Sequence, residues 1–264
     1  MPVLEIIGDR TINGFAYIGG LFQLGVRAAY YVFVAPFKGK ALRLDRAIHQ
    51  AMAIGVEALP IVSLITFFVG LILALNGAYE LRKFGALQFV ASAVAISLTR
   101  ELGPLMTAIV VIGRSGSAFA AEIGTMKVTE EIDALETMAL NPVQFLVTPK
   151  FLAMLIMMPA LTVWADFMGI LGGAVFGVTS AGFTFQTYLQ ATLDALYVHD
   201  INTGLVKAVM FGMTITAVGC HEGFRTGAGA EEVGRSTTAA VVMSIFLVII
   251  VDVIFTAIFY FTGA

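Results

Sequence analysis

Five long runs of apolar residues constrain the fold of this chain more than any other feature of its sequence. A transmembrane helix needs about 20 consecutive, mostly apolar residues to cross the hydrocarbon core of a bilayer. Charged residues make up only 12% of the chain, whereas soluble domains carry about 25%. The sequence therefore predicts an all-α membrane protein whose spans cover residues 52–78, 86–113, 151–178, 203–219 and 239–261.

The segment before the first span differs from a typical span. Residues 11–37 are apolar but are interrupted by glycines and Arg27, and they carry Tyr30 and Tyr31 near their end. Because aromatic rings and long cationic side chains suit the headgroup level, this pattern favours an interfacial helix. The first ten residues lack the basic start and the cleavage site of a signal peptide, so we expect them to remain in the mature protein.

The Lys and Arg residues between the spans predict the orientation of the chain in the membrane. Nine of them fall on one side, namely Lys38, Lys40, Arg43, Arg46, Arg114, Lys127, Lys150, Arg225 and Arg235. Only Arg82 and Lys83 fall on the other side. The positive-inside rule places the nine cations in the cytoplasm, so the C-terminus is expected outside.

A short acidic helix is predicted over residues 125–141, directly after the second span. Thr129 is its expected N-cap, and Asn141 followed by Pro142 is expected to end it. Its apolar stripe consists of Val128, Ile132, Leu135 and Ala139, and its carboxylates are Glu130, Glu131, Asp133 and Glu136. The segment is too short and too charged to span a bilayer, so we expect it at the membrane surface.

Charged residues inside the spans are the first candidates for function. Arg100 and Glu101 stand side by side in the second span, and each charge costs about 2.5–3.5 kcal/mol on insertion scales. Such a pair is expected to face a protein interior, and Lys207 of another span can share that interior. Glu57, Asp166 and Asp252 could be protonated or paired, and both alternatives stay open.

Glycines in the third span predict a helix-packing seam. Gly169, Gly172, Gly173 and Gly177 recur within two turns. Small residues at such spacing let helix backbones approach closely where lipid supplies no hydrophobic drive.

Motifs for catalysis fail in this sequence. There is no phosphate-binding loop, Gly113 to Ser117 only resembles part of a nucleophile elbow, and His221 to Arg225 has arginine where a second metal-binding histidine would stand. The single cysteine, Cys220, offers no internal disulfide, and a net charge of -3 gives no reason to expect nucleic acid. We therefore expect no catalytic residue and no metal site.

Several motifs together resemble the MlaE-type permease family, the membrane subunits of lipid-transporting ABC systems that work with MCE proteins. The resemblance rests on residues 100–104 (RELGP), 113–118 (GRSGSA), 121–126 (AEIGTM) and 129–130 (TE). It continues in residues 55–60, 68–76, Lys207 and 234–238, and so covers nearly the whole chain. His49, Glu57, Asn76 and Asp166 depart from the family pattern, which leaves the headgroup preference open.

The resemblance implies one permease domain over residues 1–264 of a protein in the bacterial inner membrane. Residues 11–37 would form its elbow helix, and residues 125–141 would form a cytoplasmic coupling helix between the second and third spans. The implied partners are a second copy of the chain, ABC ATPase subunits with or without a small accessory subunit, a periplasmic MCE-domain protein and a membrane lipid. The ATPase would bind ATP and Mg, so this chain would be a non-catalytic subunit without a cofactor.

The resemblance also assigns candidate site residues. Arg100, Glu101, Lys207 and Arg235 match positions on the lipid path or its cytoplasmic mouth. We place a lipid cavity at the homodimer interface, with Leu71, Leu75 and Leu98 as apolar walls. ATPase coupling is assigned to Glu122, Glu130, Glu131, Ile132, Asp133, Leu135 and Glu136, where Ile132 and Leu135 would fill an apolar floor on the partner.

Two other functions remain to be separated from an ATP-driven permease. A stand-alone proton-coupled carrier could use Glu57, Glu101, Asp166 and Lys207 as a relay. An intramembrane enzyme is disfavoured because its motifs fail. The acidic surface helix favours the permease, since neither alternative requires it.

Overall fold

The protein is almost entirely helical in the part of the chain that the structure describes. The structure is a computed structural model that describes residues 2–34 and 43–262, with side chains in the first helix described at residue 12 and from residue 14 onward. Residues 35–37 of the predicted elbow helix, together with Lys38 and Lys40, lie outside the described residues. Five helical stretches are long and apolar enough to cross a membrane: Leu44–Lys83, Leu87–Val128, Val143–Thr179, Val198–Arg225 and Ala230–Thr262. The prediction of an all-α protein with five spans is confirmed.

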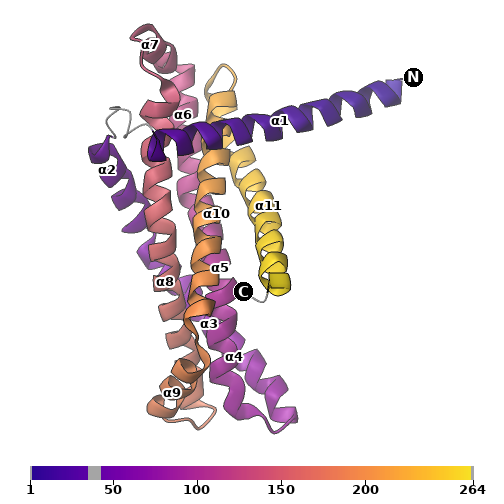
Figure 1. Ribbon diagram of the computed structural model, residues 1–264, viewed down its shortest axis with the longest axis vertical. Helices are drawn as coiled ribbons and strands as arrows, with labels where there is room; N and C mark the ends of the chain where they lie inside the picture. The colour runs from indigo at the N-terminus through magenta and orange to yellow at the C-terminus, as the bar shows by residue number, and fades with distance from the viewer. Residues whose placement is uncertain (1, 35–42, 263–264) are drawn as a thin grey trace. The chain divides into compact units, whose positions relative to one another are not determined.

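The helices are shown in Figure 1 and follow one another along the chain. The α-helices are α1 (Pro2–Phe33), α2 (Leu44–Gly55), α3 (Leu59–Lys83), α4 (Val90–Ser97), α5 (Gly103–Val111), α6 (Ser117–Val128), α7 (Glu131–Thr137), α8 (Thr148–Thr179), α9 (Phe185–Ala195), α10 (Val198–Arg225) and α11 (Ala230–Thr262). A short 3₁₀ turn, η2 (Leu87–Phe89), precedes α4. Three π-helical turns, η3 (Leu98–Leu102), η4 (Ile112–Gly116) and η5 (Val143–Val147), interrupt the α-helices.

The chain divides into two compact units. The first contains residues 1–50, 115–153 and 213–244, and the second contains residues 51–114, 154–212 and 245–264. Each unit therefore collects segments that are distant in the sequence.

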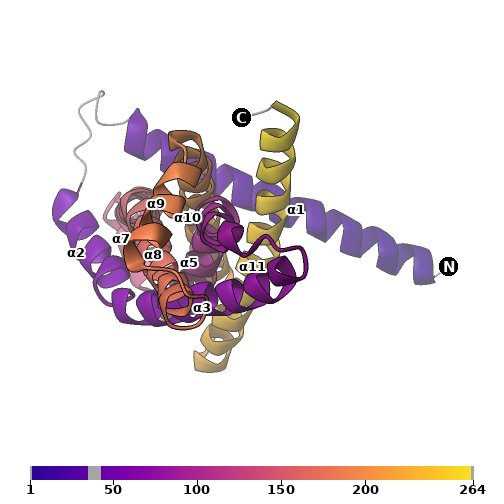
Figure 2. The same cartoon turned by 90° about the horizontal axis from the view of Figure 1, so that it is seen from below.

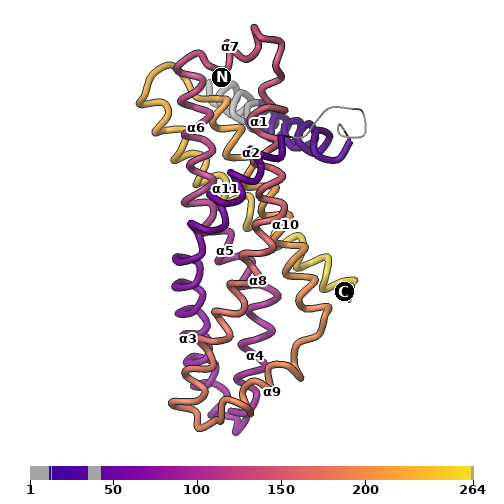
Figure 3. Tube along the Cα trace, turned by 90° about the vertical axis from the view of Figure 1, so that its left-hand side faces the viewer, coloured from indigo at the N-terminus to yellow at the C-terminus, as the bar shows by residue number. Residues whose placement is uncertain are grey.

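In the second unit, α3 and α8 run side by side, as Figures 1 and 3 show. A Cβ atom on Gly172 would lie 2.0 Å from the carbonyl oxygen of Phe67, and one on Gly70 would lie 1.9 Å from that of Gly169. Because no side chain larger than hydrogen fits at these points, the backbones are in direct contact. The predicted glycine seam is confirmed: Gly169 and Gly172 lie against the backbone of α3, whereas Gly173 and Gly177 lie against the side chain of Tyr188.

The core of the second unit joins α3, α4, α8 and α9. Ala74, Ala78, Val90, Val94 and Leu98 form one buried cluster. Tyr188 of α9 packs on Ala91 and Ala174, and its ring covers Gly177. Burial raises the pKa of Tyr188 to about 12, so its hydroxyl stays protonated at neutral pH.

In the first unit, α1 is one continuous helix that contacts α10 (Figures 1 and 2). The ring of Tyr17 meets the ring of His221 edge-on at 5.0 Å, and the guanidinium of Arg225 lies 5.2 Å from the centre of the Tyr17 ring. Burial and the nearby carboxylate of Glu222 raise the pKa of Tyr17. His221 and Arg225, which resembled part of a metal motif, therefore fix α1 to α10.

The turn between the second and third spans differs from its prediction. The second span continues to Val128, and Thr129 ends this helix instead of capping the next one. Glu130 has a φ of 61°, which breaks the chain direction before the seven-residue α7 begins. The side chain of Asn141 accepts the N–H groups of Val143 and Gln144, so it caps the following helical turn. The sequence pattern missed these boundaries because a Thr-Glu-Glu run also suits the first turn of a helix.

Candidate functional site

A π-helical turn places the charged pair of the second span. Pro104 has no N–H to give to the carbonyl of Arg100, and its ring would collide with that carbonyl in a regular α-helix. The chain widens into η3 at residues 98–102, which contains Arg100 and Glu101. Wide turns of this kind often occur at functional sites.

Gly204 lets α10 approach this turn. A Cβ atom on Gly204 would lie 2.0 Å from the carbonyl oxygen of Thr99, so only glycine allows the contact. One turn before Gly204 lies Asp200, and about one turn after it lies Lys207. The same close approach therefore supplies a partner to Arg100 and another to Glu101.

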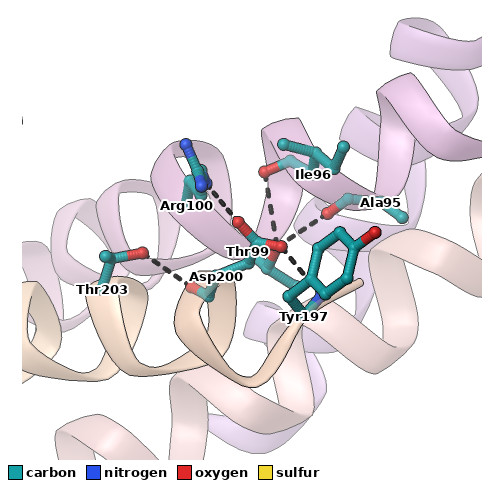
Figure 4. A network of polar contacts seen from close by, with 7 residues as sticks. All are labelled: Ala95, Ile96, Thr99, Arg100, Tyr197, Asp200 and Thr203. Atoms are coloured by element: carbon teal, nitrogen blue, oxygen red, sulfur yellow. Dashed lines mark hydrogen bonds and ion pairs between the residues drawn. The ribbon is translucent and has the colours of Figure 1, made fainter. Parts of the chain in front are cut away.

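Asp200 pairs with Arg100, as the close-up in Figure 4 shows. Its other carboxylate oxygen accepts the backbone N–H of Tyr197 at 2.9 Å, and its carbonyl accepts the hydroxyl of Thr203 at 2.8 Å. The Asp200 side chain is only 3% exposed, whereas that of Arg100 is 46% exposed. Asp200 is thus held in place by α10, while about half of the Arg100 side chain remains exposed.

Lys207 is the centre of the second half of the cluster. Its Nζ lies 2.6 Å from a carboxylate oxygen of Glu101, 2.7 Å from the hydroxyl of Thr256 and 3.0 Å from a carboxylate oxygen of Asp252. The hydroxyl of Thr256 donates in turn to Glu101 at 3.0 Å. This buried ammonium therefore has two carboxylate oxygens and one hydroxyl oxygen within 3.0 Å. The expectation that Lys207 shares an interior with the Arg100–Glu101 pair is confirmed.

The cluster contains more carboxyl groups than cations. Two cations, Arg100 and Lys207, face the three carboxyl groups of Glu101, Asp200 and Asp252. Lys207 is 1% exposed, but Glu101 is 38% exposed and borders a cavity of about 150 Å³. That cavity is lined by Arg100, Glu101, Thr203, Lys207, Thr256, Phe259 and Tyr260. Arg100 and Glu101 thus offer both signs of charge to a group in the cavity.

The sequence-based site omitted Asp200 and Thr256 and left the role of Asp252 open. Asp252 and Thr256 are four residues apart and so share one face of α11. This spacing could have indicated a polar face in the fifth span. Asp200 was not identified because it lies in a segment more polar than a span. Its i, i+7 relation to Lys207 on one helix face could have indicated it.

The remaining lipid-path candidates do not belong to the cluster around Arg100, Glu101 and Lys207. Leu75 is 46% exposed and lines a cavity of about 240 Å³. Leu71 is half-buried, but Leu98 is fully buried in the core cluster. Leu98 is therefore not a cavity wall in this structure, because a leucine at a packed π-helical turn fills the core. Arg235 belongs to the first unit, where it pairs with Glu232 at 2.8 Å.

Residues assigned to ATPase coupling fall into three groups. The carboxylates Glu130, Glu131, Asp133 and Glu136 are exposed. Ile132 and Leu135 are 8% and 7% exposed, so they anchor α7 to its own chain, and the expectation that they fill a floor on the partner does not fit this placement. The apolar side chain that α7 and its C-terminal end present is Met138, which is 61% exposed. Glu122 binds the buried Lys150 at 2.7 Å.

The other acidic residues of the spans have distinct surroundings. Glu57 pairs with Arg114, whose guanidinium also donates to the carbonyl of Ala53 at 2.7 Å. Asp166 packs against Gly103, where a Cβ atom would meet its carboxylate oxygen at 1.8 Å. No group of three or more His, Cys, Asp or Glu in the described part of the chain could hold a metal ion.

Five apolar helices with ionisable groups gathered among them define a multi-pass membrane protein, in which such groups commonly mark a substrate or ion pathway. Comparison with known families agrees with this class. The family of the permease MlaE matches residues 47–258 of the chain. The chain therefore belongs to the MlaE permease family.

Individual relatives are similar over most of their length. A probable ABC transporter permease protein of Rickettsia felis is 41% identical over 260 residues, which cover 98% of each chain. The intermembrane phospholipid transport system permease protein MlaE of Haemophilus influenzae is 34% identical over 265 residues, again 98% of each chain. The chloroplast protein TRIGALACTOSYLDIACYLGLYCEROL 1 of Arabidopsis thaliana is 34% identical over 227 residues, which cover 86% of this chain and 64% of that one.

Proposed function

We propose that this chain is the permease subunit of an ABC transporter that moves phospholipids between the inner membrane and a periplasmic MCE protein. Family membership and the name of the Haemophilus relative support the transport of phospholipid. The single observation that carries the proposal is the Arg100–Glu101–Lys207 cluster, which offers charge beside a cavity inside the spans. Two copies of the chain would enclose the lipid, since one five-span protomer is small for two acyl chains.

The energy comes from a separate ATPase in this proposal. The acidic α7 supports it, because its four exposed carboxylates and Met138 form a surface that suits a basic groove with an apolar floor. Ile132 and Leu135 keep α7 in place from beneath. ATP and Mg bind to the partner, and this chain stays non-catalytic.

The proton-coupled carrier is the weaker reading. Its relay requires Glu57, Glu101, Asp166 and Lys207 to exchange protons in sequence. Glu57 instead pairs with Arg114, and Lys207 is ion-paired with Glu101 and Asp252.

Lipid transfer by charge variants tests the transport site. The assembled complex carrying Glu101→Ala or Lys207→Ala is expected to keep its subunits but to transfer phospholipid to the MCE partner more slowly and with altered lipid-stimulated ATP hydrolysis. Glu80→Ala is the matched control, since Glu80 is 62% exposed and pairs with Lys83 three residues away. A photo-crosslinker at Leu75 should capture the lipid in transit. Normal transfer by both charge variants, together with crosslinks only to bulk lipid, would rule this site out.

Charge reversal on α7 tests the coupling surface. Glu136→Lys is expected to weaken retention of the ATPase because the exposed carboxylate faces the partner, whereas Asp194→Lys on the exposed face of α9 should leave retention unchanged. Leu135→Asp should release the ATPase more completely, since it removes the anchor of the whole helix. Full retention of the ATPase by Glu136→Lys and Leu135→Asp would contradict this role of α7.

A further inference from the structure

A second cluster of cations lies in the first unit. It surrounds a cavity of about 100 Å³, between α2 and the start of α8. The lining residues are Arg46, His49, Gln50, Glu122, Phe145, Leu146, Pro149 and Lys150. By the positive-inside rule this region belongs to the cytoplasmic side of the membrane.

Two arginines meet at one aromatic ring beside this cavity. The guanidinium carbons of Arg43 and Arg46 lie 4.2 Å and 3.9 Å from the centre of the Phe145 ring. Neither guanidinium forms an ion pair with a carboxylate among the residues that the structure describes. The ring attracts each cation, but it does not neutralise either charge.

The carboxylate in the lining does not balance these charges. Glu122 binds Lys150, which is 2% exposed, at a distance of 2.7 Å. Asp45 is also on α2, but it is not among the lining residues. Among the lining residues, the two cations Arg46 and Lys150 face the single carboxylate of Glu122, which leaves a net charge of +1. The cluster is therefore electrostatically incomplete without an anion.

The outer face of α2 indicates where that anion comes from. Leu44 and Ile48 are 56% and 59% exposed, and their spacing of four residues puts them on one stripe. In a multi-pass membrane protein such a stripe suits acyl chains. The basic side of the same helix then lies at the depth of the lipid headgroups.

We propose that this cavity, the α2 basic pocket, binds the phosphate group of a phospholipid in the cytoplasmic leaflet. Planar guanidinium groups match two phosphate oxygens at once, and phosphate is small enough for a cavity of about 100 Å³. The acyl chains follow the stripe of Leu44 and Ile48. This site requires only that the chain is in a membrane, so it does not depend on the transport function proposed above.

Photo-crosslinking in nanodiscs tests the pocket without altering its lining. In one variant of the full-length chain, a benzophenone side chain replaces Ile48. In the control variant it replaces Phe246 of α11, which is similarly exposed at 58%. The bilayer is a phosphate-free diacyl glycolipid doped with phosphatidylglycerol. At Ile48 we expect phosphatidylglycerol to be enriched about tenfold over its share of the bilayer, the factor expected for one charge-assisted contact. At Phe246 the crosslinked lipids should follow the bilayer composition.

Variants of nearby cations test whether the α2 basic pocket causes the enrichment of phosphatidylglycerol at Ile48. Arg46→Gln is expected to remove most of it, Arg46→Lys should retain part of it, and Arg27→Gln should leave it unchanged, since Arg27 is an exposed cation of α1. Equal lipid composition at Ile48 and Phe246, or full enrichment in Arg46→Gln, would overturn the proposal. Loss of enrichment on addition of inorganic phosphate would also overturn the lipid assignment, because the occupant would then be a soluble phosphate. A Glu101→Ala variant that keeps the enrichment but fails in lipid transfer would separate this pocket from the transport site.

Discussion

Replacing Lys207 by methionine should destabilise the protein more than any single surface charge change. Methionine keeps a similar volume but removes the ammonium that lies 2.6 Å from Glu101 and 3.0 Å from Asp252. The two carboxylates would then face each other without a cation. Removing one partner of a buried ion pair costs about 3–5 kcal/mol.

The lower end of this range applies here. Glu101 is 38% exposed and is partly hydrated, whereas Asp252 is 16% exposed. We therefore expect Lys207→Met to cost about 3 kcal/mol. For a chain of this size the change corresponds to a fall in Tm of roughly 6–12 °C. Adding Asp252→Asn should restore about half of the loss, since it removes one of the two uncompensated charges.

Thermal unfolding of the detergent-solubilised protein measures these differences. Lys83→Met is the matched control, because Lys83 is 50% exposed and its pairing with Glu80 contributes little. A loss below about 0.5 kcal/mol in Lys207→Met, the size typical of surface substitutions, would refute the reasoning. So would a double variant that is less stable than Lys207→Met alone.

Three further predictions follow from the backbone and the topology. Gly172→Ala should destabilise the protein by about 1–3 kcal/mol, because its Cβ would lie 2.0 Å from a backbone oxygen. The control Gly77→Ala has open space around the new Cβ and should be neutral or slightly stabilising. Thermal unfolding measures both differences. Ala139→Gly should stabilise the protein by about 1 kcal/mol in the same assay, since Ala139 has a φ of 56°, and a loss of stability would contradict this account of α7. In a Cys220→Ala background, cysteines at Asp133 and Ala264 should react with a membrane-impermeant reagent from opposite sides, and labelling of both from one side would exclude the proposed orientation.

The fold was largely predictable because its main determinants are local. Apolar runs of span length and the periodic glycines of α8 follow directly from the chemistry of a bilayer. The boundaries were less predictable. Thr129 to Glu131 suits a helix start as well as a helix end, and only the left-handed conformation of Glu130 decides between them.

The site was predictable only in part. Arg100, Glu101 and Lys207 stand out because charge is costly inside a span. Leu98 and Leu135 look like any other leucine in the sequence, and their burial depends on tertiary packing. Asp200 reaches Arg100 because Gly204 lets two helices touch, a contact between residues 100 positions apart that no local pattern contains.

Purification of the native complex tests the central claim most directly. The chain is isolated from membranes of its host, and ATP hydrolysis by the isolated material is measured with and without added phospholipid. We predict that a Walker-type ATPase co-purifies and that phospholipid changes its rate of hydrolysis, with an altered response in Glu101→Ala. Transfer of phospholipid by the chain alone, driven by a proton gradient and without any ATPase, would contradict the account.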